Sequence, residues 1–148
     1  MWIDKQKTIN LQLEMPVRLS TYRKGNAIPP LPGTSIFHST ELFHVFEMTR
    51  GYEPLLIVAY IGNRPVGKLL AVIRKSVRLF PPAIIKRCEI YGTGEYFDEA
   101  QNKEDLFGEI LEHLTNEVLC KSSSSATWKI RYSDTKPSER TTISPLIG

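Results

Sequence analysis

The sequence predicts one α/β domain with a mixed, mainly antiparallel sheet and helices on its faces. Three observations lead to this fold class. Residues 54–75 contain two apolar segments joined by a Gly-Asn turn, residues 103–120 show one long amphipathic pattern, and residues 126–132 alternate like a strand. A hairpin pairs its strands antiparallel, whereas a strand–helix–strand unit favours a parallel pair, so together they predict a mixed sheet.

The chain before the hairpin is expected to form a strand, a loop and a short helix. Residues 9–15 alternate between apolar and polar side chains, which is the period of a half-buried strand. Three prolines and two glycines within residues 25–33 predict a loop. Ser39 is a suitable N-cap and Gly51 a suitable stop, so residues 40–50 are expected to be helical.

The hairpin is expected at the centre of the sheet. Residues 54–61 (PLLIVAYI) are almost continuously apolar, which is typical of a short strand covered on both faces. Gly62-Asn63 is a hairpin-turn signal, and residues 66–75 are expected to form the returning strand. Pro81-Pro82 interrupts the chain, and residues 84–91 then predict a third strand that ends at Gly92.

The long helix has the most regular pattern. Leu106, Ile110, Leu114 and Val118 recur at four-residue steps within residues 103–120, which gives one apolar stripe. Residues 122–125 form a polar linker to the last strand, and the chain from residue 135 onward has no periodicity. We therefore expect one domain over residues 1–134 and a C-terminal tail over residues 135–148.

Composition and cysteine content argue against several classes of protein. The chain is 41% hydrophobic and 24% charged, as in ordinary globular domains. Cys88 and Cys120 have no metal-ligand spacing, so two free thiols and no structural metal are expected. No apolar run approaches transmembrane length, and the first residues lack the apolar core of a secretory signal. A cytoplasmic protein without a membrane-spanning segment is therefore expected.

Charged residues are unevenly distributed, although the net charge is only +3. Residues 54–88 contain seven bases and no acid, whereas residues 89–117 contain nine acids and a single Lys or Arg. The seven bases are Arg64, Lys68, Arg74, Lys75, Arg78, Lys86 and Arg87. This pattern predicts either two solvated surfaces of opposite charge or a basic groove that attracts RNA or another phosphate-bearing ligand.

Residues 87–94 (RCEIYGTG) combine glycines with the end of this basic stretch. Backbone N–H groups of such a loop can hold a phosphate between a strand and a helix. The candidate ligand-binding residues are Arg87, Gly92, Thr93, Gly94, Arg74 and Lys75. A plain turn is the alternative, because P-loop and dinucleotide fingerprints are absent. Five acids at the start of the following helix would also repel a phosphate: Glu95, Asp98, Glu99, Glu104 and Asp105.

Few residues are candidates for catalysis. Glu89 and Tyr91 lie on one face of the strand that ends at Gly92, where they could act as base and acid beside a cleft. The alternative is that they are exposed strand residues without a role. His38, His44 and His113 share no spacing that indicates a site, and no Gly-x-Ser-x-Gly elbow is present.

Residues 35–99 carry a series that goes beyond a generic α/β pattern. IFHS (36–39) precedes the short helix, RGYEP (50–54) follows it, and PVGKLL (65–70) opens the returning strand of the hairpin. The series resembles the first half of the GNAT-type acyltransferase fold. Within that fold it is most similar to the Fem-type group, bacterial enzymes that add amino acids from aminoacyl-tRNA to peptidoglycan precursors.

The resemblance implies a mixed sheet that splays open to hold an acyl donor, with transfer to an amine. GNAT acetyltransferases grip coenzyme A with an Arg/Gln-x-x-Gly-x-Gly/Ala loop, which is not matched here because Arg87 lies five positions before Gly92. Fem-type enzymes do without that loop but carry two such domains, and this chain has room for one. No catalytic residue of the family maps onto the sequence, and the cofactor stays unknown.

Two functions follow as expectations. The first is an acyl- or aminoacyltransferase-related domain, truncated or completed by a partner chain, with aminoacyl-tRNA or a phosphorylated precursor as ligand. The second is a non-catalytic interaction module that retains the fold without the chemistry. A homo-oligomer formed through a sheet edge is an expected partner arrangement.

Overall fold

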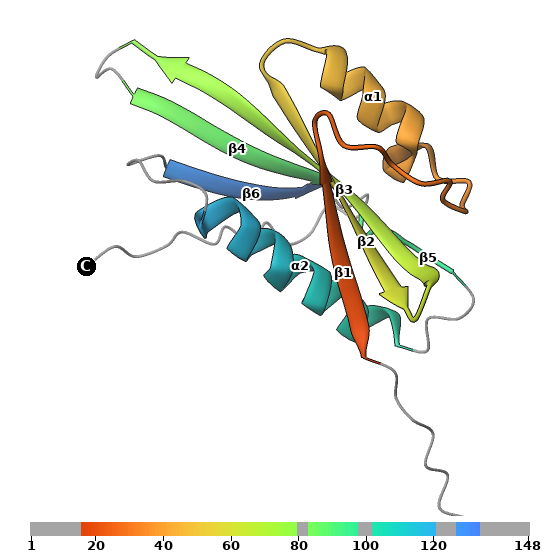
Figure 1. Ribbon diagram of the computed structural model, residues 1–148. Helices are drawn as coiled ribbons and strands as arrows, with labels where there is room; N and C mark the ends of the chain where they lie inside the picture. Colours follow the sequence, from red (N-terminus) through yellow and green to blue (C-terminus); the bar gives the residue numbers. More distant parts are fainter. Residues whose placement is uncertain (1–15, 80–82, 98–101, 121–126, 134–148) are drawn as a thin grey trace, which may run out of the picture.

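The computed structural model describes residues 16–79, 83–97, 102–120 and 127–133. In chain order its elements are β1 (Val17–Arg23), the 3-10 turn η1 (Ile36–His38), α1 (Thr40–Met48), β2 (Tyr52–Ile61), β3 (Arg64–Arg78), β4 (Ala83–Tyr91), β5 (Glu95–Tyr96), α2 (Lys103–Cys120) and β6 (Thr127–Ser133) (Figure 1).

The strands form one six-stranded sheet in the order β1-β2-β3-β4-β6, and the short β5 pairs with β3. Strands β1 to β4 pair antiparallel, whereas β4 and β6 pair parallel. The parallel pair follows from the chain path, because α2 carries the chain from the end of β5 back to the start of β6. The expected mixed, mainly antiparallel sheet with helices on its faces is therefore confirmed.

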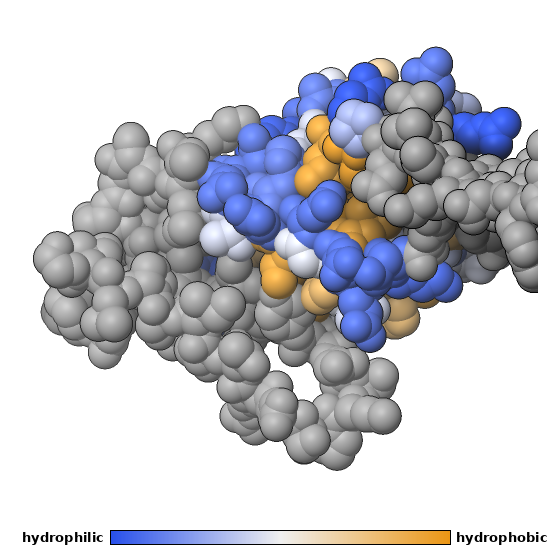
Figure 2. Space-filling view, turned by 90° about the horizontal axis from the view of Figure 1, so that it is seen from below, coloured by the Kyte–Doolittle hydropathy of each residue, from blue (hydrophilic) through white to orange (hydrophobic). Residues whose placement is uncertain are grey.

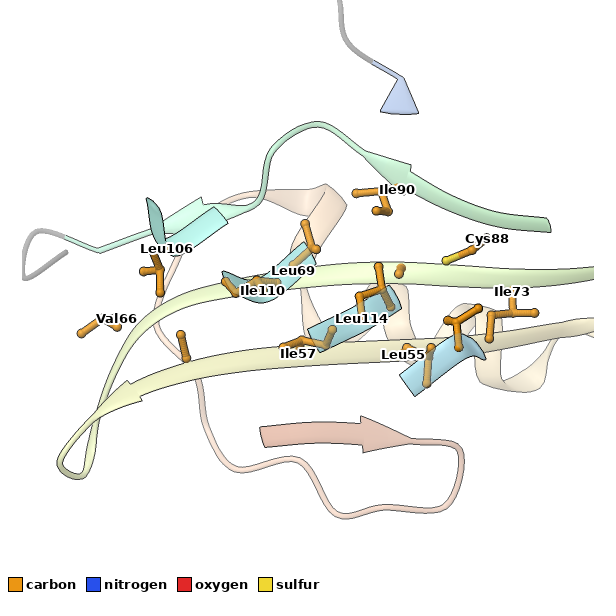
Figure 3. Close-up of a cluster of buried hydrophobic side chains, with 13 residues drawn as sticks. Leu55, Ile57, Val66, Leu69, Ile73, Cys88, Ile90, Leu106, Ile110 and Leu114 are labelled. Carbon is orange, nitrogen blue, oxygen red and sulfur yellow. The ribbon is translucent and has the colours of Figure 1, made fainter. Parts of the chain in front are cut away.

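The two helices lie on opposite sides of the sheet (Figure 1). On the α2 side, the apolar stripe of the helix packs on alternate residues of the central strands (Figure 3). This core consists of Leu55, Ile57, Ala59, Val66, Leu69, Ala71, Ile73, Cys88, Ile90, Leu106, Ile110, Leu114 and Val118. On the α1 side, the core consists of Phe43, Leu56, Val58, Tyr60, Leu70 and Val72. The central strand β2 is thus covered on both faces, as its continuous apolar run predicts.

Hydrophobic residues also come to the surface along one side of the molecule. Figure 2, a view from below Figure 1, shows them in a strip bordered by hydrophilic residues. Apolar residues at the margin of the α2-side core include Val17, Leu19, Ile61, Phe107 and Leu111.

Polar contacts join β1 to α2 near this margin: Thr21 hydrogen-bonds to His113, and Arg23 pairs with Glu117. His113 is therefore a half-buried boundary residue.

Most predicted elements agree with the observed ones within a few residues. The helix expected at residues 40–50 is α1, and the Ser39 hydroxyl caps it by accepting a hydrogen bond from the Leu42 N–H at 3.1 Å. The helix expected at residues 103–120 has the bounds of α2, and its apolar stripe is buried. Neither described helix is long and apolar enough to cross a membrane.

The strand expected from the alternation of residues 9–15 lies outside the described residues and stays a prediction. The described strand is β1, which the sequence did not predict. It pairs with β2 along its whole length, from Val17 opposite Ile61 to Arg23 opposite Leu55. The linker at residues 122–125, Pro81-Pro82 and the tail from residue 135 also lie outside the described residues.

The sheet does not splay between β4 and β6 in the part that the structure describes. Their pairing is continuous from Ile85 opposite Thr127 to Tyr91 opposite Ser133. The interruption lies instead on β3, whose pairing with β4 ends at Ala71 and whose pairing with β5 begins at Lys68. The opening that the family resemblance implies is therefore absent from this ladder.

Candidate functional site

Four side chains predicted for the site lie on the α1 side of the sheet. Val72 packs into the α1-side core, so Arg74, two residues further along β3, points to the same side. Cys88 and Ile90 pack into the α2-side core, so the alternate residues of β4 point to the α1 side. These alternate residues are Arg87, Glu89 and Tyr91. Figure 1 shows β3 and β4 extending away from α1, which leaves this part of the face without a described helix over it.

Two arginines are neighbours on this surface. Arg74 and Arg87 are directly opposite each other in the β3–β4 ladder. The Arg74 guanidinium lies 5.7 Å from the ring centre of Tyr52, where a cation–π attraction operates. The Nε atom of Arg87 is buried and has no hydrogen-bond partner among the described residues. Like charges opposite each other across two strands repel, so an anion bound between them would stabilise the pair.

Glu89 and Tyr91 interact with each other. Burial raises the pKa of Tyr91, and the charge of Glu89 and a hydrogen bond to it raise this pKa further. The phenol therefore keeps its proton at neutral pH and donates a hydrogen bond to the Glu89 carboxylate. The ring of Phe37 stacks on the ring of Tyr91, with centroids 6.3 Å apart.

We call this surface the aromatic–basic face, and it consists of Phe37, Tyr52, Arg74, Arg87, Glu89 and Tyr91. The backbone of β6 continues it, because Lys129 pairs with Arg87 and Arg131 pairs with Glu89 in the parallel ladder. The structure thus brings both predicted catalytic residues and two of the predicted ligand-binding residues together.

Lys75 is not part of this face. It lies on the α2 side of β3, where it forms an ion pair with Glu53 and sits opposite Lys86. Adjacent residues of a strand point to opposite faces, so Arg74 and Lys75 cannot share one site on β3. Lys68 is also separate, because it is buried. The described part of the basic stretch at residues 54–88 is therefore divided between two faces and the interior, which speaks against the alternative of a single basic groove.

The Gly92-Thr93-Gly94 segment is a turn that leads from β4 into β5. Gly92 and Gly94 have positive φ angles of 78° and 99°, which glycine adopts without strain. The Tyr96 hydroxyl donates a hydrogen bond of 2.6 Å to the carbonyl of Thr93. A Cβ atom on Gly94 would lie 3.1 Å from the carbonyl oxygen of Lys68. These contacts give the segment a structural role, and its binding of a phosphate stays a prediction.

A buried ion pair lies beside this turn. Lys68 is only 3% exposed, and its ammonium lies 3.2 Å from Oε2 of Glu95. The ammonium also donates a hydrogen bond of 2.8 Å to the carbonyl of Pro32. Oε1 of Glu95 accepts hydrogen bonds from the backbone N–H groups of Thr34 and Ser35, at 2.6 and 2.9 Å. The pair therefore ties the proline-rich loop to β3 and β5.

Glycine at position 33 allows the carboxylate to approach the loop this closely. Gly33 has a φ of 116°, and a Cβ atom there would lie 2.4 Å from Oε2 of Glu95. Burial raises the pKa of Glu95, but the N–H groups of Ser35 and Thr34 and the ammonium of Lys68 outweigh it and lower the pKa. The carboxylate is consequently charged at neutral pH.

The hydrogen bonds of Glu95 correct the expectation that all five acids gather at the start of α2. Its carboxylate accepts hydrogen bonds from the proline-rich loop, whereas Glu104 and Asp105 form the acidic first turn of α2. Asn102 accepts a hydrogen bond from the N–H of Asp105 at 3.4 Å, as an N-terminal cap does. Asp98 and Glu99 lie outside the described residues.

Sequence reasoning missed the buried pair because it assigned Lys68 to a basic surface and Glu95 to the helix start. One signal was present. Lys68 lies between Gly67 and Leu69 in an apolar strand that is buried on both faces, and a charge in that position requires a partner. The partner itself could not be found from spacing, because the turn at residues 92–94 sets which acid reaches Lys68.

A pocket of about 560 Å³ lies next to this pair. It is lined by Pro32, Gly33, Thr34, Arg64, Pro65, Glu95, Tyr96 and Phe97. None of the residues of the aromatic–basic face lines it, so the two surfaces are separate. Its charged side chains are of opposite sign, which gives it no preference for an anion or a cation.

The described side chains include neither a metal-binding group nor a reactive thiol. No group of His, Cys, Asp or Glu side chains there is arranged to hold a metal ion. Cys88 is a free, buried thiol, and burial together with the charge of Glu89 raises its pKa to about 12. Such a thiol stays protonated and is a poor nucleophile.

Comparisons with known proteins give one kind of match. No family model matches the sequence, and no curated protein matches it. Two solved structures are similar to the chain, both of the aminoglycoside acetyltransferase meta-AAC0020 from an uncultured soil metagenomic sample. One is in complex with trehalose (TM-score 0.45) and the other with sisomicin (TM-score 0.46). Each is 11% identical, and each alignment covers 89% of this chain and 95% of that chain.

Proposed function

We propose that this chain is an acyltransferase-related domain of the GNAT type whose aromatic–basic face binds a phosphate-bearing ligand. The finer assignment is a Fem-type reaction, in which an aminoacyl group passes from tRNA to an amine. The observation that supports it is the grouping of Arg74, Arg87, Glu89 and Tyr91 on the α1 side of β3 and β4.

The arginines favour a phosphate as the group that is bound. Neither guanidinium is paired with a carboxylate among the described residues, and Arg87 has an unused Nε–H. Guanidinium groups bind phosphate through two parallel hydrogen bonds, and two of them side by side suit a doubly charged group.

The aromatic rings favour a nucleotide as the carrier of that phosphate. Tyr52 borders the arginines, and the stacked rings of Phe37 and Tyr91 lie on the same side of the sheet. Base–aromatic stacking typically contributes about 1–3 kcal/mol per base. A surface with both arginines and stacking rings therefore suits the single-stranded end of a tRNA better than an isolated phosphate.

Glu89 and Tyr91 would carry out the proton transfers of such a reaction. Glu89 takes a proton from the attacking amine, and Tyr91 donates one to the oxygen that leaves the ester. The raised pKa of Tyr91 keeps its proton in place until that step. The products are an amide and a free hydroxyl on the RNA, which balances the transferred protons.

The ligand is tested by titrating the chain with aminoacyl-tRNA, a lipid-linked precursor and coenzyme A at low and moderate salt. We expect salt-sensitive binding of aminoacyl-tRNA, because phosphate contacts displace counterions. Arg74→Ala or Arg87→Ala should each weaken it about tenfold or more, since a charge-assisted hydrogen bond contributes about 1.5–3 kcal/mol.

Lys75→Ala is the matched control, because Lys75 is the chain neighbour of Arg74 but lies on the opposite face. It should leave the affinity within about twofold, as exposed substitutions away from a site do. Equal losses for Arg74→Ala and Lys75→Ala would mean that net charge, and not this face, attracts RNA. An absence of salt-sensitive binding to all three ligands would refute the proposal.

The site also has room for a partner chain. β6 is the last strand in the sheet order, and its outer edge has no partner among the described residues. A strand added there would extend the aromatic–basic face, as strand addition does in other complexes. A truncated domain completed in this way remains part of the proposal, and co-purified or added chains that restore activity would support it.

The second candidate is a non-catalytic interaction module, and exposed apolar side chains of η1 and α1 favour it. Ile36, Val45 and Met48 are 69%, 51% and 79% exposed, and such residues are frequent in protein interfaces. This function predicts a stable dimer in sedimentation that Val45→Asp dissociates. It also predicts no thermal shift with any of the three ligands, whereas the transferase proposal predicts a shift.

A further inference from the structure

The ladder of β3 has a gap between its two partners. Its last pair with β4 joins Ala71 to Ile90, and its first pair with β5 joins Lys68 to Glu95. Leu69 and Leu70 fall between these two ladders, opposite the turn at residues 92–94. Backbone groups in such a buried gap need other partners, because an unpaired N–H or carbonyl there is costly.

His38 occupies this gap with its side chain. It belongs to η1, is only 3% exposed, and its Nδ1 accepts a hydrogen bond of 3.1 Å from the N–H of Leu70. The backbone of Tyr91 also hydrogen-bonds to the imidazole, and because this bond favours the protonated ring, its acceptor is the Tyr91 carbonyl. We call these two hydrogen bonds the His38 bridge.

The bridge requires one protonation state of the ring. Nδ1 can accept from Leu70 only while it carries no proton, so the neutral ring must carry its proton on Nε2. A proton added to Nδ1 would place two donors face to face, and the bond to Leu70 would be lost.

The charged groups around the ring come from β3 and β5. Burial lowers the pKa of His38, Glu95 raises it, Lys68 lowers it, and the bond to Tyr91 raises it. The net direction is downward, so the ring is neutral at and above neutral pH. The ion pair of Lys68 and Glu95 thus lies within electrostatic range of the bridge.

The bridge also positions a residue of the aromatic–basic face. Phe37 precedes His38 in η1 and stacks on Tyr91, while His38 holds the backbone of Tyr91. A movement of His38 is consequently transmitted to the ring stack through its covalent neighbour Phe37 and through its hydrogen bond to the Tyr91 backbone.

We propose that the His38 bridge is a proton-sensitive device: the neutral imidazole closes the gap in β3 through Leu70, and the protonated imidazole releases Leu70, which shifts η1 and breaks the stacking of Phe37 on Tyr91. The hydrogen bond from Leu70 and the stacking of Phe37 on Tyr91 carry this device. Only its consequence for ligand binding rests on the proposed function.

The direct test follows the structure by NMR from pH 8 to pH 4.5 in a His44→Gln, His113→Gln chain, in which His38 is the single imidazole. Since the pKa of His38 lies below the ordinary value of 6.5, the bridge is complete above pH 6.5 and is lost as the pH falls below that value. As His38 takes up its proton, the amide of Leu70 should lose its protection and the contact between Phe37 and Tyr91 should disappear. Signals of the α2-side core, such as those of Ile57 and Ile110, should stay native.

Two outcomes would overturn the device. In one, His38 titrates while the Leu70 amide and the Phe37–Tyr91 contact stay unchanged. In the other, all native signals vanish together, which would mean that protonation of His38 unfolds the whole domain and does not release η1 locally. His38→Asn adds a second measurement, because its amide oxygen can take the place of Nδ1 without titrating. The Phe37–Tyr91 contact should then persist across the whole pH range.

A third measurement, of ligand binding against pH, distinguishes a failure of the bridge from a failure of the proposed function. Aminoacyl-tRNA binding should weaken about tenfold per pH unit below the pKa of His38 in the wild-type chain, relative to His38→Asn, if only the neutral form binds. Equal pH dependence of the two chains, with the structural titration intact, would leave the bridge standing and refute its link to this ligand.

Discussion

Replacing Glu95 by alanine is expected to lower the free energy of unfolding by about 3–5 kcal/mol, which is the usual cost of breaking one partner out of a buried ion pair. The substitution leaves the ammonium of Lys68, which is only 3% exposed, without a negative charge beside it. It also removes the acceptor of the Thr34 and Ser35 N–H groups. Urea denaturation followed by circular dichroism measures the change.

A double variant separates the cost of the unpaired charge from the cost of the lost loop contacts. Glu95→Ala combined with Lys68→Met removes both charges, and it should recover much of the loss because no buried charge remains unpaired. Glu104→Ala, in the exposed first turn of α2, is the matched acidic control and should change stability by about 0.5 kcal/mol or less. A double variant as unstable as the single one would show that the loop contacts, and not the charge, dominate.

Phe43→Ala is expected to cost about 3–5 kcal/mol, because a fully buried aromatic side chain is lost and a cavity remains. Phe43 is 0% exposed and is the residue of α1 that is wholly within the α1-side core. It packs in the same core as Leu56, Val58 and Leu70, and the N–H of Leu70 bonds to His38 of η1. Thermal and urea unfolding give the loss, and the binding assay shows whether the aromatic–basic face still forms.

Met48→Ala provides the control on the same helix. Met48 is 79% exposed, so its truncation should stay within about 0.5 kcal/mol of the wild type. A small effect of Phe43→Ala would contradict the assigned packing of α1. A large effect of Met48→Ala would instead indicate that a second chain covers this surface in solution.

The elements with strong local periodicity could be predicted from the sequence. The stripe of α2 and the apolar run of β2 each identify their element because burial on one or two faces leaves a pattern in a single segment. β1 leaves no such pattern. All but one of its seven residues are half-buried, and its place is fixed by pairing with β2, which lies far along the chain.

The candidate site could be predicted only in part, for the same reason. The alternation along β4 already places Arg87, Glu89 and Tyr91 on one face, and the register with β3 adds Arg74. That alternation also excludes Lys75, which a simple count of charges had included. The bridge of His38 could not be foreseen, because it depends on a gap that two ladders create on β3.

The close approach of Gly33 to Glu95 has a consequence for mutational tolerance. Position 33 is exposed and would be taken for a freely variable loop residue, yet any side chain there would displace a carboxylate that three other groups hold. Gly25 also has a positive φ, of 84°, but nothing lies within 4 Å of a Cβ atom there. A saturation library selected for folding should accept asparagine at position 25, since asparagine tolerates this conformation, and should retain only glycine at position 33. The two loop glycines would thus respond differently to selection, one limited by its backbone alone and the other by a neighbour 62 positions along the chain.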